Sequence, residues 1–122
     1  MHTIEIPKRL WTSRLDEISK THEGWLVSLE IVSQPTGVRH QFHQLPLVGV
    51  TAEQTDGRMI SIAVEEPTGE HLTHMIHSPK KVVFDESPSG ALASVEIVGS
   101  DGSTAVLRLR SLAALHRKAG GP

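Results

Sequence analysis

Several residue types that carry common protein chemistry are missing from this chain. There is no cysteine, which excludes disulfides, thiolate nucleophiles, iron–sulfur clusters and cysteine-ligated zinc. Tyrosine and asparagine are also absent, which excludes tyrosyl chemistry and N-glycosylation. No apolar run has the length or flanks of a membrane span or a signal peptide, so we expect a cytoplasmic protein without a membrane partner.

Neither sign of charge is in large excess. The chain has 14 acidic and 12 basic residues and a net charge of -2, so it has no general attraction to phosphate backbones. This balance argues against a nucleic-acid partner. A local basic patch near the C-terminus remains open, and its candidates are Arg108, Arg110, His116, Arg117 and Lys118.

The chain length of 122 residues, with 38% hydrophobic residues, fits one folded domain over residues 1–122. A helix is predicted over about residues 7–21, because Pro7 suits a first helical position. Within it, four apolar residues share one stripe at about 100° per residue. They are Leu10, Trp11, Leu15 and Ile18.

From Trp25 onward, through about residues 25–110, the apolar residues alternate with a period of two, which is typical of strands. Turn signals separate the strands, among them Gln34-Pro35-Thr36-Gly37, Thr55-Asp56-Gly57-Arg58 and Ser100-Asp101-Gly102-Ser103. Pro46 cannot donate to a strand ladder, so we expect it at an edge, bulge or corner. Residues 111–122 form a tail in which Ser111 could cap a short helix through Lys118, and an extended tail fits local propensity equally well.

Histidines recur at every third position in one short segment, as His71, His74 and His77. If residues 69–77 form a short helix, the three imidazoles and Glu70 lie opposite an apolar side. Histidines three apart on a helix can share a metal ion, so this stripe is the candidate metal site. A solvated connector explains the same stripe more simply, and a pH-responsive contact is a third interpretation.

No other pattern indicates catalysis or a cofactor. The serines do not stand in a nucleophile elbow, and Gly99-Ser100-Asp101-Gly102 is a hairpin rather than a phosphate loop. His40 and His43 are expected on opposite faces of one strand. Asp85 and Glu86 are expected to point to opposite sides of another strand and to be solvated. We therefore assign neither catalytic nor cofactor-binding residues.

An ordered set of motifs resembles the bacterial family catalogued as domain of unknown function 5335. The resemblance extends from about Ile4 to Arg110 and supplies no activity. Its motifs are Ile6-Pro7 with Trp11, Leu45-Pro46-Leu47-Val48-Gly49-Val50, His74-Met75-Ile76-His77-Ser78-Pro79, Val83-Phe84-Asp85-Glu86, Gly90 with Ser94-Val95-Glu96-Ile97-Val98, Asp101-Gly102 and Leu107-Arg108-Leu109-Arg110.

The sequence thus predicts an α+β fold, in which an N-terminal helix packs on a strongly bent antiparallel β-sheet or small β-barrel of about seven strands. For function we favour a non-catalytic binding or protein-interaction domain, as a homodimer or with another protein. One alternative is a small metal-dependent protein or enzyme that uses His71, His74 and His77. The other is a nucleic-acid-binding barrel that uses Arg39, Arg108 and Arg110.

Overall fold

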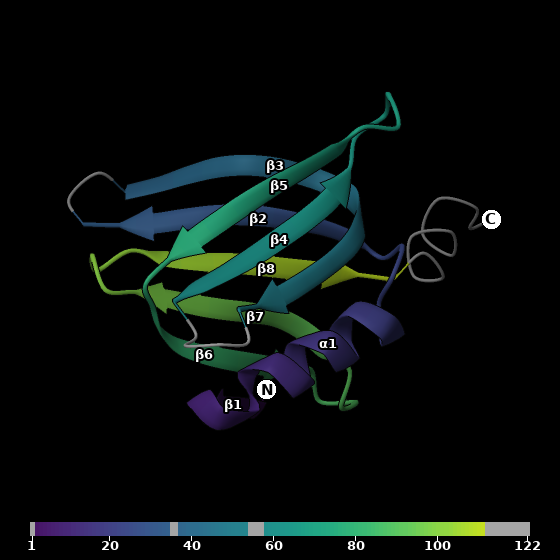
Figure 1. The fold of residues 1–122 in the computed structure, drawn as a ribbon. Helices are drawn as coiled ribbons and strands as arrows, with labels where there is room; N and C mark the ends of the chain where they lie inside the picture. Colours follow the sequence, from purple (N-terminus) through teal and green to yellow (C-terminus); the bar gives the residue numbers. More distant parts are fainter. Residues whose placement is uncertain (1, 35–36, 54–57, 112–122) are drawn as a thin grey trace.

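The computed structural model describes residues 2–34, 37–53 and 58–111. One α-helix and eight strands make up these residues (Figure 1). In chain order they are β1 (His2–Ile6), a 3-10 turn (Lys8–Leu10), α1 (Trp11–Thr21), β2 (Leu26–Ser33), β3 (Gly37–Ala52), β4 (Met59–Glu65), β5 (His71–His77), β6 (Pro79–Glu86), β7 (Leu92–Gly99) and β8 (Thr104–Arg110).

All neighbouring strands are antiparallel, and their order across the sheet is β1-β6-β7-β8-β2-β3-β4-β5. The bent antiparallel sheet with an N-terminal helix is confirmed, but the barrel is wrong. The sheet stays open, since β1 and β5 stand at its two ends and do not pair. The strand number of about seven was also too low. The two strands expected on either side of Pro46 are one long strand, while β1 and β5 were not predicted as strands.

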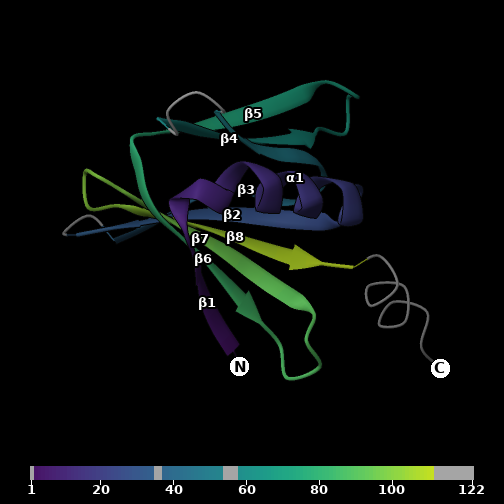
Figure 2. The same ribbon diagram turned by 60° about the horizontal axis from the view of Figure 1, so that its bottom comes forward.

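The bend of the sheet lies in β3, which is 16 residues long. Its first part pairs with β2 as far as Pro46, and its second part pairs with β4 from Leu47 onward. Pro46 therefore stands where β3 changes partners, which is the corner expected for a residue without an N–H. As a result β4 and β5 form a layer that lies over the remaining strands (Figure 2).

Helix α1 packs along the open side of the two layers (Figure 2). Trp11, Leu15 and Ile18 of the predicted stripe are buried, and Leu10 packs partly against the core. Burial of each such side chain contributes about 1.5–3 kcal/mol, enough to fix the helix on the sheet. The Trp11 indole Nε1 donates a buried hydrogen bond of 2.9 Å to the carbonyl of Ile6 at the end of β1.

Ser19 joins α1 to the backbone of β3. Its Oγ lies 2.8 Å from the amide nitrogen of Val50, which donates to it, and 2.8 Å from the Val50 carbonyl oxygen. One hydroxyl thus replaces the strand neighbour that β3 lacks beyond Pro46.

The turn between β7 and β8 forms at Asp101-Gly102 as predicted, with Gly102 at φ +90°. The other two predicted hairpins include residues 35–36 and 54–57, which lie outside the described residues. The tail prediction for residues 111–122, and with it His116, Arg117 and Lys118 of the basic patch, falls almost wholly outside them as well. Among the helices that the structure describes, none is long and apolar enough to cross a membrane.

Candidate functional site

The histidine segment is strand β5, not a helix. Each of its seven residues pairs with β4, from Glu65↔His71 to Met59↔His77. A tight turn precedes it, in which the amide of Glu66 donates to the carbonyl of Glu70 at 2.8 Å and Gly69 has φ +92°. The helix expectation was therefore wrong, because tertiary pairing with an aliphatic strand overrides a three-residue spacing that fits a helix.

A strand places alternate side chains on opposite faces, so the three histidines do not share one face. His74 points toward the core side with Leu72 and Ile76, while His71 and His77 lie on the outer face. The two outer histidines are six residues apart, which is about 20 Å along a strand. Within residues 2–34, 37–53 and 58–111, no three or more His, Asp or Glu side chains gather where they could hold a metal ion. The metal site of His71, His74, His77 and Glu70 stays a prediction that one chain alone does not assemble.

His74 lines a cleft of about 230 Å³ at the mouth between the two layers. Arg39 of β3 lines the same cleft, as does Asp101 of the β7–β8 turn. Burial lowers the pKa of His74 below its usual value, and the positive charge of Arg39 lowers this pKa further. His74 is therefore held as a neutral imidazole near neutral pH.

The free backbone groups of β5 can be assigned from the ladder that it forms with β4. The amide of Ser78 donates to the carbonyl of Arg58 at 2.7 Å, and Glu66 and Glu70 are bonded at the opposite end. Hydrogen-bonded pairs alternate along an antiparallel ladder, so the even-numbered residues of β5 bond to β4. The N–H and C=O groups of the odd-numbered residues, His71, Thr73, Met75 and His77, therefore point to the open edge.

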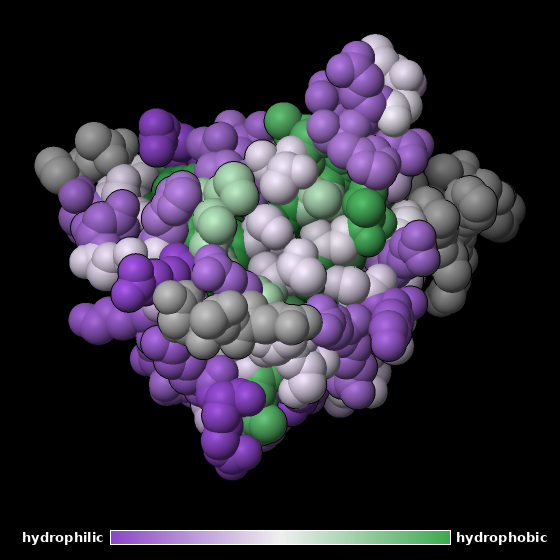
Figure 3. Space-filling model, in the orientation of Figure 1, coloured by the Kyte–Doolittle hydropathy of each residue, from purple (hydrophilic) through white to green (hydrophobic). Residues whose placement is uncertain are grey.

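Apolar side chains accompany this open edge. Leu72 is 37% exposed and Met75 is 47% exposed, and both are among the most exposed large hydrophobic residues of the described chain. The strand itself contains no lysine, arginine, aspartate or glutamate. Figure 3 shows hydrophobic and near-neutral residues in the middle of the face formed by β4 and β5, with hydrophilic residues around them. This edge lacks the charges that usually protect an edge strand from pairing.

A second polar cluster crosses the outer face of the sheet at the β1 end. Thr3, Asp85 and Ser94 stand side by side on β1, β6 and β7. Asp85 is only 6% exposed, and it accepts hydrogen bonds from Thr3 Oγ1 at 2.9 Å and Ser94 Oγ at 2.8 Å. The prediction of a solvated Asp85 was wrong, because its neighbours on the two adjacent strands, β1 and β7, cover it.

Glu96 on β7 completes this cluster. A hydrogen bond with Glu96 is the main cause that lowers the pKa of Asp85, and the same bond raises the pKa of Glu96. Such opposite changes are those of two carboxyl groups that share one proton. Sequence reasoning missed the pair, since residues 85 and 96 meet only through the register of β6 and β7.

Next to this pair, a cleft of about 340 Å³ lies over β8, β2 and β3. Arg108 Nε donates to Glu30 Oε1 at 2.7 Å, which lowers the pKa of Glu30. His40 and His43 both line the cleft, although we predicted them on opposite faces. The reason is a β-bulge in β3, since the register shifts by one residue between Leu29↔Phe42 and Glu30↔His40.

The three arginines proposed for nucleic acid do not form one surface. Arg108 and Arg110 line the outer cleft, whereas Arg39 lines the mouth beside His74. Arg108 is already paired with Glu30. Nucleic-acid binding by these residues stays a prediction to which the arrangement adds no support.

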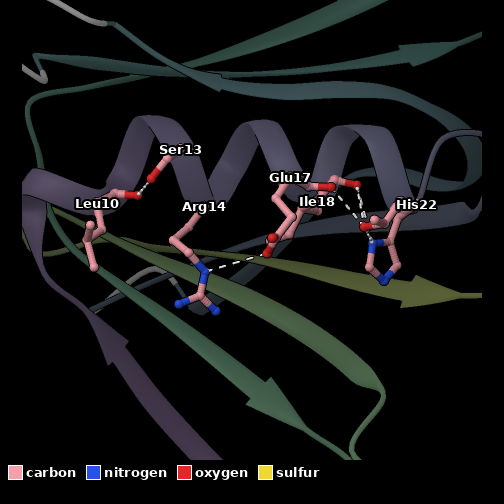
Figure 4. Close-up of polar contacts among 7 residues, drawn as sticks. Leu10, Ser13, Arg14, Glu17, Ile18 and His22 are labelled. Atoms are coloured by element: carbon pink, nitrogen blue, oxygen red, sulfur yellow. Dashed lines mark hydrogen bonds and ion pairs between the residues drawn. The ribbon is translucent and has the colours of Figure 1, made fainter.

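A third cleft, of about 270 Å³, lies beside the C-terminal half of α1. The Arg14 guanidinium lies 5.3 Å from the centre of the Phe84 ring. The Arg14 Nε is 3.8 Å from Glu17 Oε1 (Figure 4). The His22 ring packs edge-on against Trp25, with the two ring centres 4.4 Å apart. Burial lowers the pKa of the His22 imidazole. Among these contacts, the one between Arg14 and Phe84 joins α1 to β6.

Comparison with known proteins gives the chain its family. Residues 2–118 match the model of the "Family of unknown function (DUF5335)", and the chain belongs to this family, as its motifs predicted. It is similar to an "Uncharacterized protein" of Aquifex aeolicus (strain VF5), with 28% identity over 110 residues that cover 90% of this chain and 94% of that protein. No solved structure matches the chain.

Proposed function

We propose that this protein is a non-catalytic interaction domain that binds by adding a strand to β5, and that its partner is a second copy of itself. The observation that supports this most directly is the open edge of β5, whose odd-numbered residues point their backbone groups away from β4. Strand addition satisfies such groups and is a common way for small β domains to bind proteins.

The composition of β5 favours a second copy over a charged partner. Its seven residues are uncharged apart from the histidines, so two identical strands meet without like-charge repulsion. Pairing would also cover Leu72, which is 37% exposed, and Met75, which is 47% exposed. By contrast, the polar groups of the Asp85 cluster already bond to one another and offer a partner less.

The test is a proline at one position of β5. The Thr73 N–H points to the open edge, so Thr73→Pro removes a donor to the partner and leaves the ladder with β4 intact. We expect Thr73→Pro to remain folded by circular dichroism and to sediment as a monomer at concentrations where the wild type is a dimer.

His74→Pro is the matched control, because the His74 N–H bonds to β4. This variant leaves a β4 carbonyl without its donor and should lose about 1–3 kcal/mol of folding stability, which urea denaturation measures. A wild type that stays monomeric at high concentration would refute the proposal, as would a Thr73→Pro variant that dimerises like the wild type.

A further inference from the structure

The spacing of the histidines in β5 is symmetric about its centre. His71 is the first residue of the strand, His74 the fourth and His77 the last. On one strand this spacing separates the rings. When two copies of β5 pair in antiparallel orientation across a two-fold axis, they run in opposite directions. Each histidine of a symmetric pattern can then face a histidine of the other copy.

The backbone limits the registers that two copies can adopt. Only odd-numbered residues of β5 offer groups at the open edge, so an odd residue must stand opposite an odd residue. If the two-fold axis passes through Thr73 or Met75, His74 meets Leu72 or Ile76, and histidine does not face histidine. If the axis passes through His74, each histidine of one copy faces a histidine of the other.

The central register also matches the apolar residues. It places Leu72 opposite Ile76 of the second copy on the core side, beside the two His74 residues. On the outer face it places His71 opposite His77 of the second copy, as a hydrogen-bonded pair with Cα atoms about 5.5 Å apart.

A carboxylate stands next to this histidine pair within each chain. Glu65 of β4 is directly opposite His71 on the same outer face, in a non-hydrogen-bonded pair whose side chains are close. Both Glu65 and His71 are exposed. Across the interface the row is therefore Glu65, His71 and then His77 of the second copy, on three adjacent strands.

We infer that the paired β5 strands form two identical zinc sites, each built from His71 and Glu65 of one copy and His77 of the other. Two imidazoles and one carboxylate are a ligand set that zinc accepts, with water at the fourth position. The inference rests on the proposed pairing through β5 and specifies its register. It also explains why the described residues of a single chain hold no metal-binding group.

The first experiment measures zinc binding and mass together, on protein without an affinity tag. Titration calorimetry should show two zinc ions per wild-type dimer, and sedimentation should show a tighter dimer with zinc than with EDTA. His71→Ala and His77→Ala should each weaken zinc binding at least about tenfold, as should Glu65→Gln. His2→Ala, which removes an exposed histidine from the other edge strand, is the matched control and should bind zinc like the wild type.

Mixing the two histidine variants gives the sharper test. In a heterodimer of His71→Ala with His77→Ala, one site loses both histidines and the other keeps both. The mixture should therefore recover tight binding of one zinc ion per heterodimer, although each variant alone has lost it. A site within a single chain cannot show this recovery.

The outcomes separate this inference from the proposed function. A dimer that forms equally with zinc and with EDTA, and whose zinc binding is unchanged in His71→Ala, would overturn the zinc site and leave the interaction domain standing. Absence of recovery in a mixture shown to contain heterodimers would overturn the shared site in the same way. A monomer under both conditions would overturn both.

Discussion

The two edge strands of the sheet, β1 and β5, differ in length, in charge and in the contacts that hold them. At one end β1 has five residues, carries Glu5, and is tied down by the side chains of its own chain. Thr3 donates to Asp85, and Trp11 donates to the Ile6 carbonyl. At the other end β5 carries no such charge, and its two most exposed apolar residues are Leu72 and Met75.

The difference supports the proposal that β5 is the binding edge. Natural sheets protect their edges with short strands, charges or covering elements, and β1 is short and carries the charged Glu5. An edge without them is prone to pair with another chain. The contrast supports the proposed binding edge at β5, while the contacts of β1 hold its own end of the sheet together.

At the β1 end of the sheet, removal of the Trp11 side chain should have the largest effect on folding stability. Trp11 is 3% exposed, and Trp11→Ala should lower the free energy of unfolding by about 3–5 kcal/mol in urea denaturation. Trp11→Phe keeps most of the apolar contact but leaves the Ile6 carbonyl without its donor, so it should cost about 1–3 kcal/mol. A Trp11→Phe variant as stable as the wild type would mean that the hydrogen bond does not anchor β1.

The carboxyl pair near β1 should have a smaller, pH-dependent effect. Because folding raises the pKa of Glu96, its contribution to stability is present at low pH and is lost as the pH rises through that raised pKa. Folding lowers the pKa of Asp85, so its contribution is lost as the pH falls through the lowered pKa. Wild-type stability should therefore fall as the pH rises above the usual pKa of Glu96.

Glu96→Gln tests this behaviour, since the amide can donate to Asp85 at every pH. We expect this variant to lack the decline and to exceed the wild type by about 1 kcal/mol at neutral pH, in urea denaturation followed across pH. Glu30→Gln is the control, because Arg108 lowers the pKa of Glu30. Loss of the Glu30 carboxylate should therefore destabilise the protein at neutral pH. The same pH slope in Glu96→Gln and wild type would contradict the shared proton.

Local patterns predicted those parts of the fold that depend on neighbours in sequence. The apolar stripe of Trp11, Leu15 and Ile18 predicted the helix, and Asp101-Gly102 predicted the hairpin between β7 and β8. Features that depend on strand pairing were not accessible in this way. The bulge that puts His40 and His43 on one face needs the register of β2 with β3.

The histidine segment shows this limit most clearly. A spacing of three fits a helical face, and the alternation of Leu72, His74 and Ile76 fits a strand equally well. Only the pairing of β5 with β4 decides between them, and the same pairing brings Glu65 beside His71. A search for ligands within the histidine segment alone could therefore not identify Glu65 as part of the proposed zinc site.

A single cysteine at the centre of β5 tests the pairing most directly. The chain has no cysteine, so His74→Cys can form a disulfide only between two copies. With the axis through residue 74, the two Cα atoms lie about 4.5 Å apart, within disulfide range. Mild oxidation should link His74→Cys into a covalent dimer with unchanged circular dichroism, whereas Leu72→Cys should stay largely monomeric on a non-reducing gel. Equal linking of the two variants, or none of His74→Cys, would contradict the account.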